Sequence, residues 1–145
     1  MPEDRKTPLP PIPIKRRGAV AVIRRDDRLL VIRRSELVAA PGAFCFPGGA
    51  IERGESEQAA LVRELREELN LSVVPQRRLW ENTTNWGVWL AWWLAEAQDD
   101  AEPIPDPAEV AAVHWLTIAE MRAMPGLLSS NHAFLDAIER REIEL

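Results

Sequence analysis

The stretch from Gly49 to Leu71 constrains this chain more than any other segment, because it joins a loop to a strongly patterned helix. It carries Glu64, Glu67 and Glu68 at positions i, i+3 and i+4. Residues at these spacings share one helix face, and at about 100° per residue the two later glutamates lie within roughly 60° of the first. Leucines fill the neighbouring arc. The stretch therefore predicts a helix that follows an N-cap at Ser56 and runs to about Leu69. It would bury one stripe and present a negative one.

The clustered carboxylates carry an energetic cost. Like charges at i and i+4 destabilise a helix by a few tenths of a kcal/mol, and the helix dipole disfavours anions in the last turns by about 0.3–1 kcal/mol each. A bound cation would turn this repulsion into binding. Mg²⁺ takes carboxylates, waters and substrate phosphates together, so we predict a site for Mg²⁺ or Mn²⁺. Taken alone, three carboxylates also fit a solvated acidic helix face.

The flanking residues favour the metal site. The stretch reads GAIERGESEQAALVRELREELNL. It resembles the signature of the Nudix hydrolases, G-x5-E-x7-R-E-U-x-E-E-x-G-U, in which U is a bulky aliphatic residue. The one departure is Asn70, where the family has glycine. This position follows the helix and is predicted to adopt a left-handed backbone conformation, for which asparagine is the best substitute for glycine.

The resemblance implies roles for the charged residues. Residues that would bind or support the metal lie in and around the stretch: Gly48 through its carbonyl, Glu55, Glu64, Glu67, Glu68 and Glu109. Arg63 would orient the glutamates. The general base is left open among Glu67, Glu68 and Glu109. For Glu109, which precedes the last predicted strand, an exposed loop acid is the alternative.

Four further residues are candidate substrate contacts: Arg33, Arg34, Trp89 and Asn131. The two arginines end a predicted strand and would meet phosphate or ribose, although a solvated strand end is the alternative. The tryptophan would stack on a base or belong to the core. Asn131 resembles the asparagine with which MutT-like Nudix proteins read a purine edge, and its alternative role is the N-cap of the last helix.

The apolar patterning predicts the remaining elements. Residues 19–25 and 29–33 form a hairpin, residues 72–75 and 76–81 are strand and turn, and residues 87–96 form a strand buried on both faces. After a loop over 98–108 come a strand over 110–116, a capping box at Thr117 and Glu120, and a helix over 131–141. This order is α+β. The resemblance implies the Nudix fold, an α/β/α sandwich with a mixed sheet between helices.

Length and composition bound the organisation of the chain. Its 145 residues suit one domain over 17–145, preceded by a proline-rich arm over 1–16. The net charge of −5 argues against double-stranded nucleic acid as a partner, and no apolar run is long enough for a membrane span. Cys45 is the single cysteine, so we expect a buried filler residue and a cytoplasmic protein.

The function that the resemblance implies is metal-dependent hydrolysis of a phosphoanhydride bond in a nucleoside diphosphate linked to another moiety. The short chain, the tryptophan-rich strand and Asn131 favour a MutT-like nucleoside triphosphate diphosphatase. The alternatives are a coenzyme A pyrophosphatase, a nucleotide-sugar or ADP-ribose pyrophosphatase, and a Nudix-fold nucleotide sensor without turnover. We expect a small-molecule nucleotide as the partner, and a monomer or homodimer.

Overall fold

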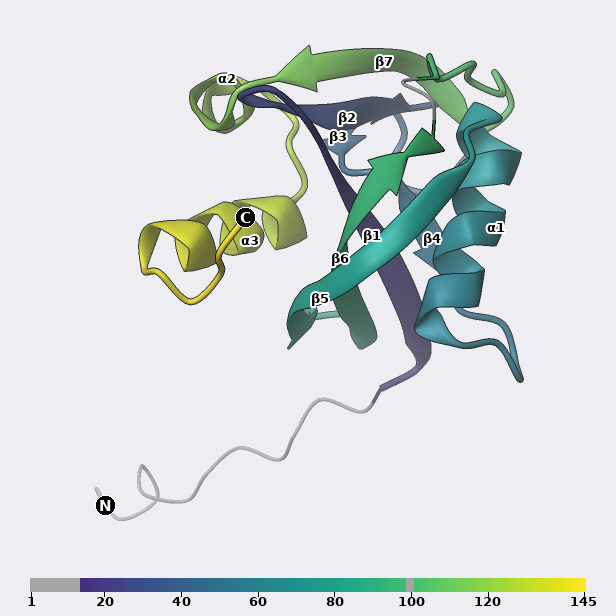
Figure 1. The fold of residues 1–145 in the computed structure, drawn as a ribbon, viewed down its shortest axis with the longest axis horizontal. Helices are drawn as coiled ribbons and strands as arrows, with labels where there is room; N and C mark the ends of the chain where they lie inside the picture. The colour runs from purple at the N-terminus through teal and green to yellow at the C-terminus, as the bar shows by residue number, and fades with distance from the viewer. Residues whose placement is uncertain (1–13, 99–100) are drawn as a thin grey trace, which may run out of the picture.

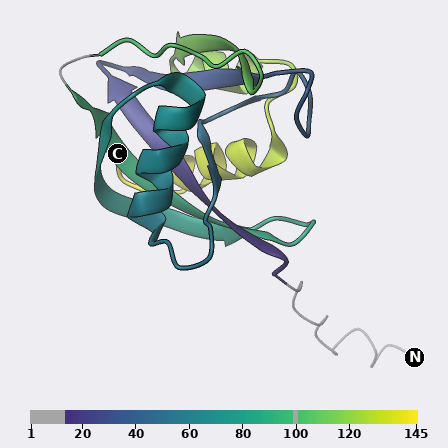
Figure 2. The same cartoon turned by 90° about the vertical axis from the view of Figure 1, so that its right-hand side faces the viewer.

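The computed structural model describes residues 14–98 and 101–145 and places a mixed β-sheet between helices (Figure 1). In chain order the elements are β1 (Arg16–Arg25), β2 (Arg28–Arg34), β3 (Phe44–Cys45), β4 (Gly48–Ala50), α1 (Glu57–Leu69), β5 (Val73–Thr83), β6 (Val88–Ala97), β7 (Val110–Leu116), α2 (Ile118–Ala123) and α3 (Ser129–Glu139). Helices α1 and α3 lie on opposite sides of the sheet (Figures 1 and 2). The predicted α+β class is confirmed.

Strand β1 is the central strand of the sheet. It pairs in parallel with β6 from Arg16↔Val88 to Ile23↔Ala95, and antiparallel with β4. It meets β2 at the hairpin, and the strand order is β3-β2-β1-β6-β5, with β4 paired to β1 and β7 to β2. Because side chains alternate along a strand, β1 contributes to a core on each side of the sheet.

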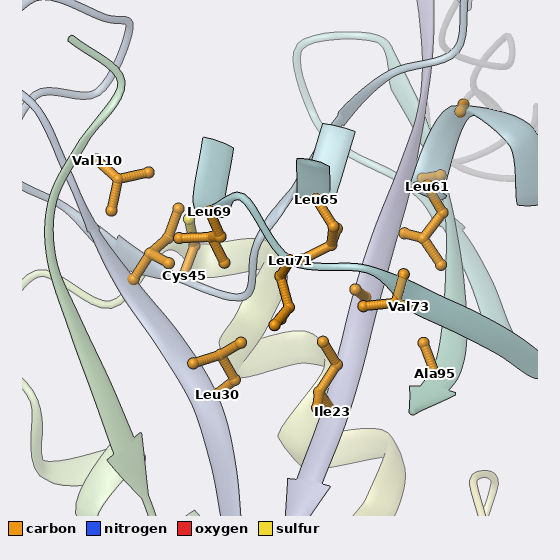
Figure 3. Packing of buried hydrophobic residues seen from close by; sticks show 14 residues of the cluster. Ile23, Leu30, Cys45, Leu61, Leu65, Leu69, Leu71, Val73, Ala95 and Val110 are labelled. Carbon is orange, nitrogen blue, oxygen red and sulfur yellow. The ribbon is translucent and has the colours of Figure 1, made fainter. Parts of the chain in front are cut away.

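The two cores separate by strand phase. On the α1 side, Ala19, Ala21 and Ile23 pack with the leucine stripe of the helix (Figure 3). On the α3 side, Val20 and Val22 pack with residues that include Trp92 and Phe134. The two aromatic rings stack with their centroids 4.7 Å apart. This second core forms the support for the cavity described below.

The ends of α1 confirm two predictions. The Ser56 hydroxyl caps the helix by accepting the amide N–H of Ala59 at 3.0 Å. Asn70 ends it with φ 48° and ψ 38°, the predicted left-handed conformation. The capping box of Thr117 and Glu120 is also present, at the start of α2.

Three predicted elements differ from the structure. The segment over 72–81 is one strand, β5, with irregularities after Pro75 and Arg78 rather than a turn. A proline is tolerated there because β5 is an edge strand. Strand β6 is fully buried only at Ala91, Trp92 and Ala95, and its other tryptophans are half-buried. Helix α3 begins at Ser129, two residues before the predicted start.

The first strand starts before residue 19, where the predicted hairpin begins. Strand β1 begins at Arg16, within the segment predicted as a proline-rich arm, and residues 1–13 of that arm lie outside the described residues. Cys45 is buried, as expected. Among the residues that the structure describes, no helix is long and apolar enough to cross a membrane.

Candidate active site

Two glycines bring the β4 backbone against the glutamate face of α1. A Cβ atom on Gly49 would lie 2.3 Å from the carboxyl carbon of Glu64, and one on Gly48 would lie 2.2 Å from the carbonyl oxygen of Ala19. The amide N–H of Gly48 donates to Glu68 Oε1 at 3.2 Å. A side chain at Gly49 would collide with Glu64 of the helix, and one at Gly48 would collide with the backbone of β1, so the two glycines allow β4 to pack between β1 and α1.

Arg63 connects the glutamates to the loop that precedes the helix. Its Nη1 donates to Glu64 Oε1 at 3.0 Å and to Glu67 Oε2 at 3.2 Å. Its Nε and Nη2 hold both oxygens of Glu55, at 2.7 and 2.9 Å, and Nη2 also donates to the Ala50 carbonyl. The hydrogen bonds from Arg63 lower the pKa of Glu55 to about 2. Arg63 therefore lies where the resemblance implies an orienting residue.

Burial and neighbouring negative charges raise the pKa of two glutamates, Glu64 and Glu68, at this network. Glu68 is 5% exposed, and burial, with the negative charges of Glu64 and Glu109, raises its pKa to about 8. Burial also raises the pKa of Glu64. Glu109 is 41 positions after Glu68 in the chain. The structure nevertheless brings it close enough for its negative charge to raise the pKa of both Glu64 and Glu68.

Backbone contacts at the end of α1 place the Glu109 loop. The amides of Ile104 and Asp106 donate to the carbonyls of Leu69 and Glu68, at 2.7 and 2.8 Å. Carbonyls in the last turn of a helix have no partner within the helix, and this loop satisfies two of them. The amide of Glu109 then donates to the Asp106 carbonyl at 2.9 Å. The loop is thus fixed to the same helix end that carries Glu68.

The donor chemistry of the cluster fits a hard divalent ion. All candidate ligands are oxygens, the atoms that Mg²⁺ and Mn²⁺ prefer. The raised pKa of Glu68 indicates charge repulsion that a cation would relieve. Within residues 14–98 and 101–145, no three acids, histidines or cysteines are already arranged as a ligand shell, since Arg63 engages Glu64 and Glu67. Binding would require those carboxylates to turn toward the ion.

A cavity of about 340 Å³ lies on the α3 side of the sheet, beside the two glycines. Residues from β1 and β6, including Gly18, Val20, Leu90 and Trp92, form its floor. The Gly48–Ala50 backbone forms one wall. Its volume is within the range of small-molecule sites. The glutamates are not among its lining residues, but Gly48 and Gly49, which contact Glu68 and Glu64, are, so the cavity suits a nucleotide whose phosphates lie next to these glycines.

Two of the four predicted substrate contacts line this cavity. Arg34 does, and its Nε donates to the Ala39 carbonyl at 2.6 Å. Asn131 also does; it is 3% exposed, and its Oδ1 accepts the amide N–H of Phe46 at 2.9 Å. The alternative role of Asn131 as an N-cap is wrong, because Leu128 precedes the helix and no side chain caps it.

Arg33 and Trp89 are not among the residues that line the cavity. Trp89 lies on the other face of β6, where the guanidinium carbons of Arg17 and Arg78 stand 4.7 and 5.0 Å from its ring centroid. Strand alternation explains the difference: Leu90 and Trp92 face the cavity, so the odd-numbered tryptophan faces away.

Trp86, which the sequence also offered as a stacking residue, lines the cavity, and so do Arg16 and Trp92, which the sequence reasoning did not name as site residues. Their signal in the sequence is the phase of the flanking strands. Once Val20 is assigned to the α3 side, Arg16 must share that side, and the β1–β6 pairing places Trp92 beside Val20. Sequence reasoning identified the strands without fixing that phase.

Comparison with known proteins gives a consistent family match. The sequence model described as NUDIX domain matches residues 14–137. The chain is 26% identical to the "NAD-capped RNA hydrolase NudC" of Stutzerimonas stutzeri over 73% of its own length and 38% of that protein. It is 45% identical to the "CTP pyrophosphohydrolase" of Escherichia coli over 35% of its length, again covering 38% of the relative.

The fold has close structural counterparts. The crystal structure of a MutT protein from Methanosarcina mazei Go1 superimposes with a TM-score of 0.76 at 21% identity. That match covers 94% of this chain and all of the other.

Proposed function

Because the chain belongs to the Nudix family, we propose that it is a metal-dependent pyrophosphohydrolase that cleaves a phosphoanhydride bond in a nucleoside diphosphate linked to another moiety. The observation that carries this proposal is the position of Glu68. It is buried against the Gly48 amide, it lies beside Glu64 and Glu109, and its pKa is raised to about 8. A plain structural domain gives no reason for three acids to converge beside the glycines that line the cavity.

The residues of the chain divide the chemistry between them. A divalent ion held by Glu64, Glu67 and Glu68 would neutralise phosphate charge and lower the pKa of a bound water. Arg63 orients Glu64 and Glu67 by donating a hydrogen bond to each carboxylate. Arg34 brings a positive charge to the cavity, where it can face a phosphate. Hydrolysis adds water across one P–O–P bond, and a carboxylate among Glu67, Glu68 and Glu109 accepts the proton that the water loses.

The inner part of the cavity supports a MutT-like nucleoside triphosphate diphosphatase. Asn131 and Phe46 meet there, next to Arg34, and a polar amide among apolar walls is the usual arrangement for orienting a base. The printed function of the E. coli relative, a CTP pyrophosphohydrolase, is of the same kind. ADP-ribose, nucleotide sugars and coenzyme A keep the same phosphoanhydride linkage and are the alternative substrates.

The proposal is tested by chromatographic detection of products with Mg²⁺ or Mn²⁺, over canonical and 8-oxo nucleoside triphosphates, ADP-ribose, NADH and coenzyme A. Glu67→Gln should abolish metal-dependent turnover of whichever substrate the wild type cleaves, and should leave the fold intact because Glu67 is an exposed side chain. Glu139→Gln, which removes an exposed acid on α3, is the matched control. Near-normal turnover in Glu67→Gln would overturn the metal-site assignment. Nucleotide binding without turnover would favour the sensor.

A further inference from the structure

The cavity has two ends. The Gly48–Ala50 backbone, which we call the glycine wall, lies between them. At its inner end are Arg34, Phe46 and Asn131, and at its outer end are Arg16 and Trp86. On β1, Val20 pairs with Gly48 while Arg16 lies four residues away, about 13 Å at 3.3 Å per residue. A diphosphate placed at the glycine wall therefore has room for a bound group on each side.

Trp86 gives the outer end of the cavity an exposed aromatic ring. Its indole is 52% exposed although it lines the cavity. The turn that carries it is fixed: the Thr84 hydroxyl accepts the amide N–H of Val88 at 3.0 Å, and the amide of Gly87 donates to the Thr84 carbonyl at 3.1 Å. A large aromatic ring on a fixed turn at a cavity rim is suited to stacking on a flat ligand group.

Arg16 lines the same cavity, and its amide N–H donates to the carbonyl of Gly87, the residue after Trp86, at 3.4 Å. It is exposed, and it shares the cavity side of β1 with Gly18 and Val20. Among the residues that the structure describes, no carboxylate forms an ion pair with it. An arginine next to an exposed aromatic ring is the combination with which proteins bind a phosphate and the base attached to it.

We propose that the outer end is a second ring subsite, in which Trp86 stacks on a flat ring of the substrate and Arg16 faces the adjoining phosphate or ribose. This rests on the proposed hydrolysis of a nucleoside diphosphate linked to another moiety. Among such substrates it favours one whose second moiety carries its own flat ring, as in a dinucleotide, over the nucleoside triphosphate that the inner end alone would accept. A nucleoside triphosphate has a single base and therefore fills only one end of the cavity. A dinucleotide has a ring on each side of its diphosphate and fills both.

The test compares NADH with ADP-ribose, two compounds that share adenine, both riboses and the diphosphate and differ only in the nicotinamide ring. The wild type should have a lower KM for NADH than for ADP-ribose. Trp86→Ala should reduce this preference roughly fivefold or more, the effect of losing one base–aromatic stack, with kcat changed much less. Trp86→Phe should restore most of it. Trp89→Ala removes a tryptophan from the opposite face and should leave the preference unchanged.

Equilibrium binding of the same two compounds, measured by calorimetry without divalent metal, separates the two proposals. If the wild type cleaves either compound but Trp86→Ala keeps the full NADH preference in KM and in Kd, the ring subsite is wrong and the hydrolase stands. If no compound is cleaved while binding shows a preference that depends on Trp86, the subsite stands and the hydrolase fails. An equal loss of preference in Trp89→Ala would also overturn the subsite.

Discussion

Glu68 links stability to function at the residue scale. Its carboxyl is buried, and its pKa is raised from 4.5 to about 8. For an acid whose pKa is higher in the folded state, the stabilising contribution is fully present below the ordinary pKa and is lost as pH rises through the folded value. The free energy of unfolding of the metal-free protein should therefore fall between about pH 5 and pH 8, by up to a few kcal/mol at about 1.4 kcal/mol per pKa unit.

Urea denaturation in EDTA across this pH range checks the expectation. Glu68→Gln carries no titrating proton at this position, so its unfolding free energy should change much less over the same range. Parallel pH profiles for the wild type and Glu68→Gln would show that Glu68 titrates normally, contrary to its position in the structure.

Residue identity predicted much of the site. The remaining residues could not be predicted because the sequence did not show which strand residues face the cavity. The match to the family signature predicted that Arg63 and the glutamates at positions 64, 67 and 68 lie together. The left-handed conformation of Asn70 was predicted from its place after the helix. Trp89 was taken from a tryptophan-rich strand whose phase was not known, and it lies on the face opposite the cavity. A one-residue difference in phase decides between a cavity wall and a surface stack, and composition does not contain it.

At the element scale, the contact between β4 and α1 sets the position of Glu64. Gly49→Ala would place a methyl group 2.3 Å from the Glu64 carboxyl carbon, so this side chain must move. A displacement of about 1 Å in a catalytic group can cost roughly 100-fold in rate, and we expect a loss of that order in kcat/KM with unchanged helix content by circular dichroism.

Gly54→Ala is the control for this prediction. Gly54 has a positive φ of 85° but open space around its Cβ position, so alanine there should lower stability without lowering kcat/KM. If Gly49→Ala were as active as the wild type, the close packing of strand against helix would not position Glu64.

The elements themselves were largely predictable, and β5 shows where local signals fail. The proline in its sequence argued for a turn, yet the chain continues as one strand because the missing N–H falls on a sheet edge. Whether a strand lies at an edge is a property of the whole sheet. In contrast, α1 was predictable because its cap, leucine stripe and end all lie within one short segment.

At the scale of the whole molecule, β1 joins the two halves of the site. Its parallel pairing with β6 and antiparallel pairing with β4 bring together segments separated by about 40 positions of sequence. The cavity also includes the start of α3, near the end of the chain. The sequence predicted each of these segments, but their common cavity depends on sheet order, which no single segment determines.

The measurement that tests the central claim most directly is Mn²⁺ binding, followed by electron paramagnetic resonance without nucleotide. The wild type should bind Mn²⁺, and Mg²⁺ should displace it. The double variant Glu64→Gln with Glu68→Gln should lose this binding, while Glu139→Gln should retain it. Equal Mn²⁺ binding by the wild type and the double variant would show that the acids facing the glycine wall are not the metal site.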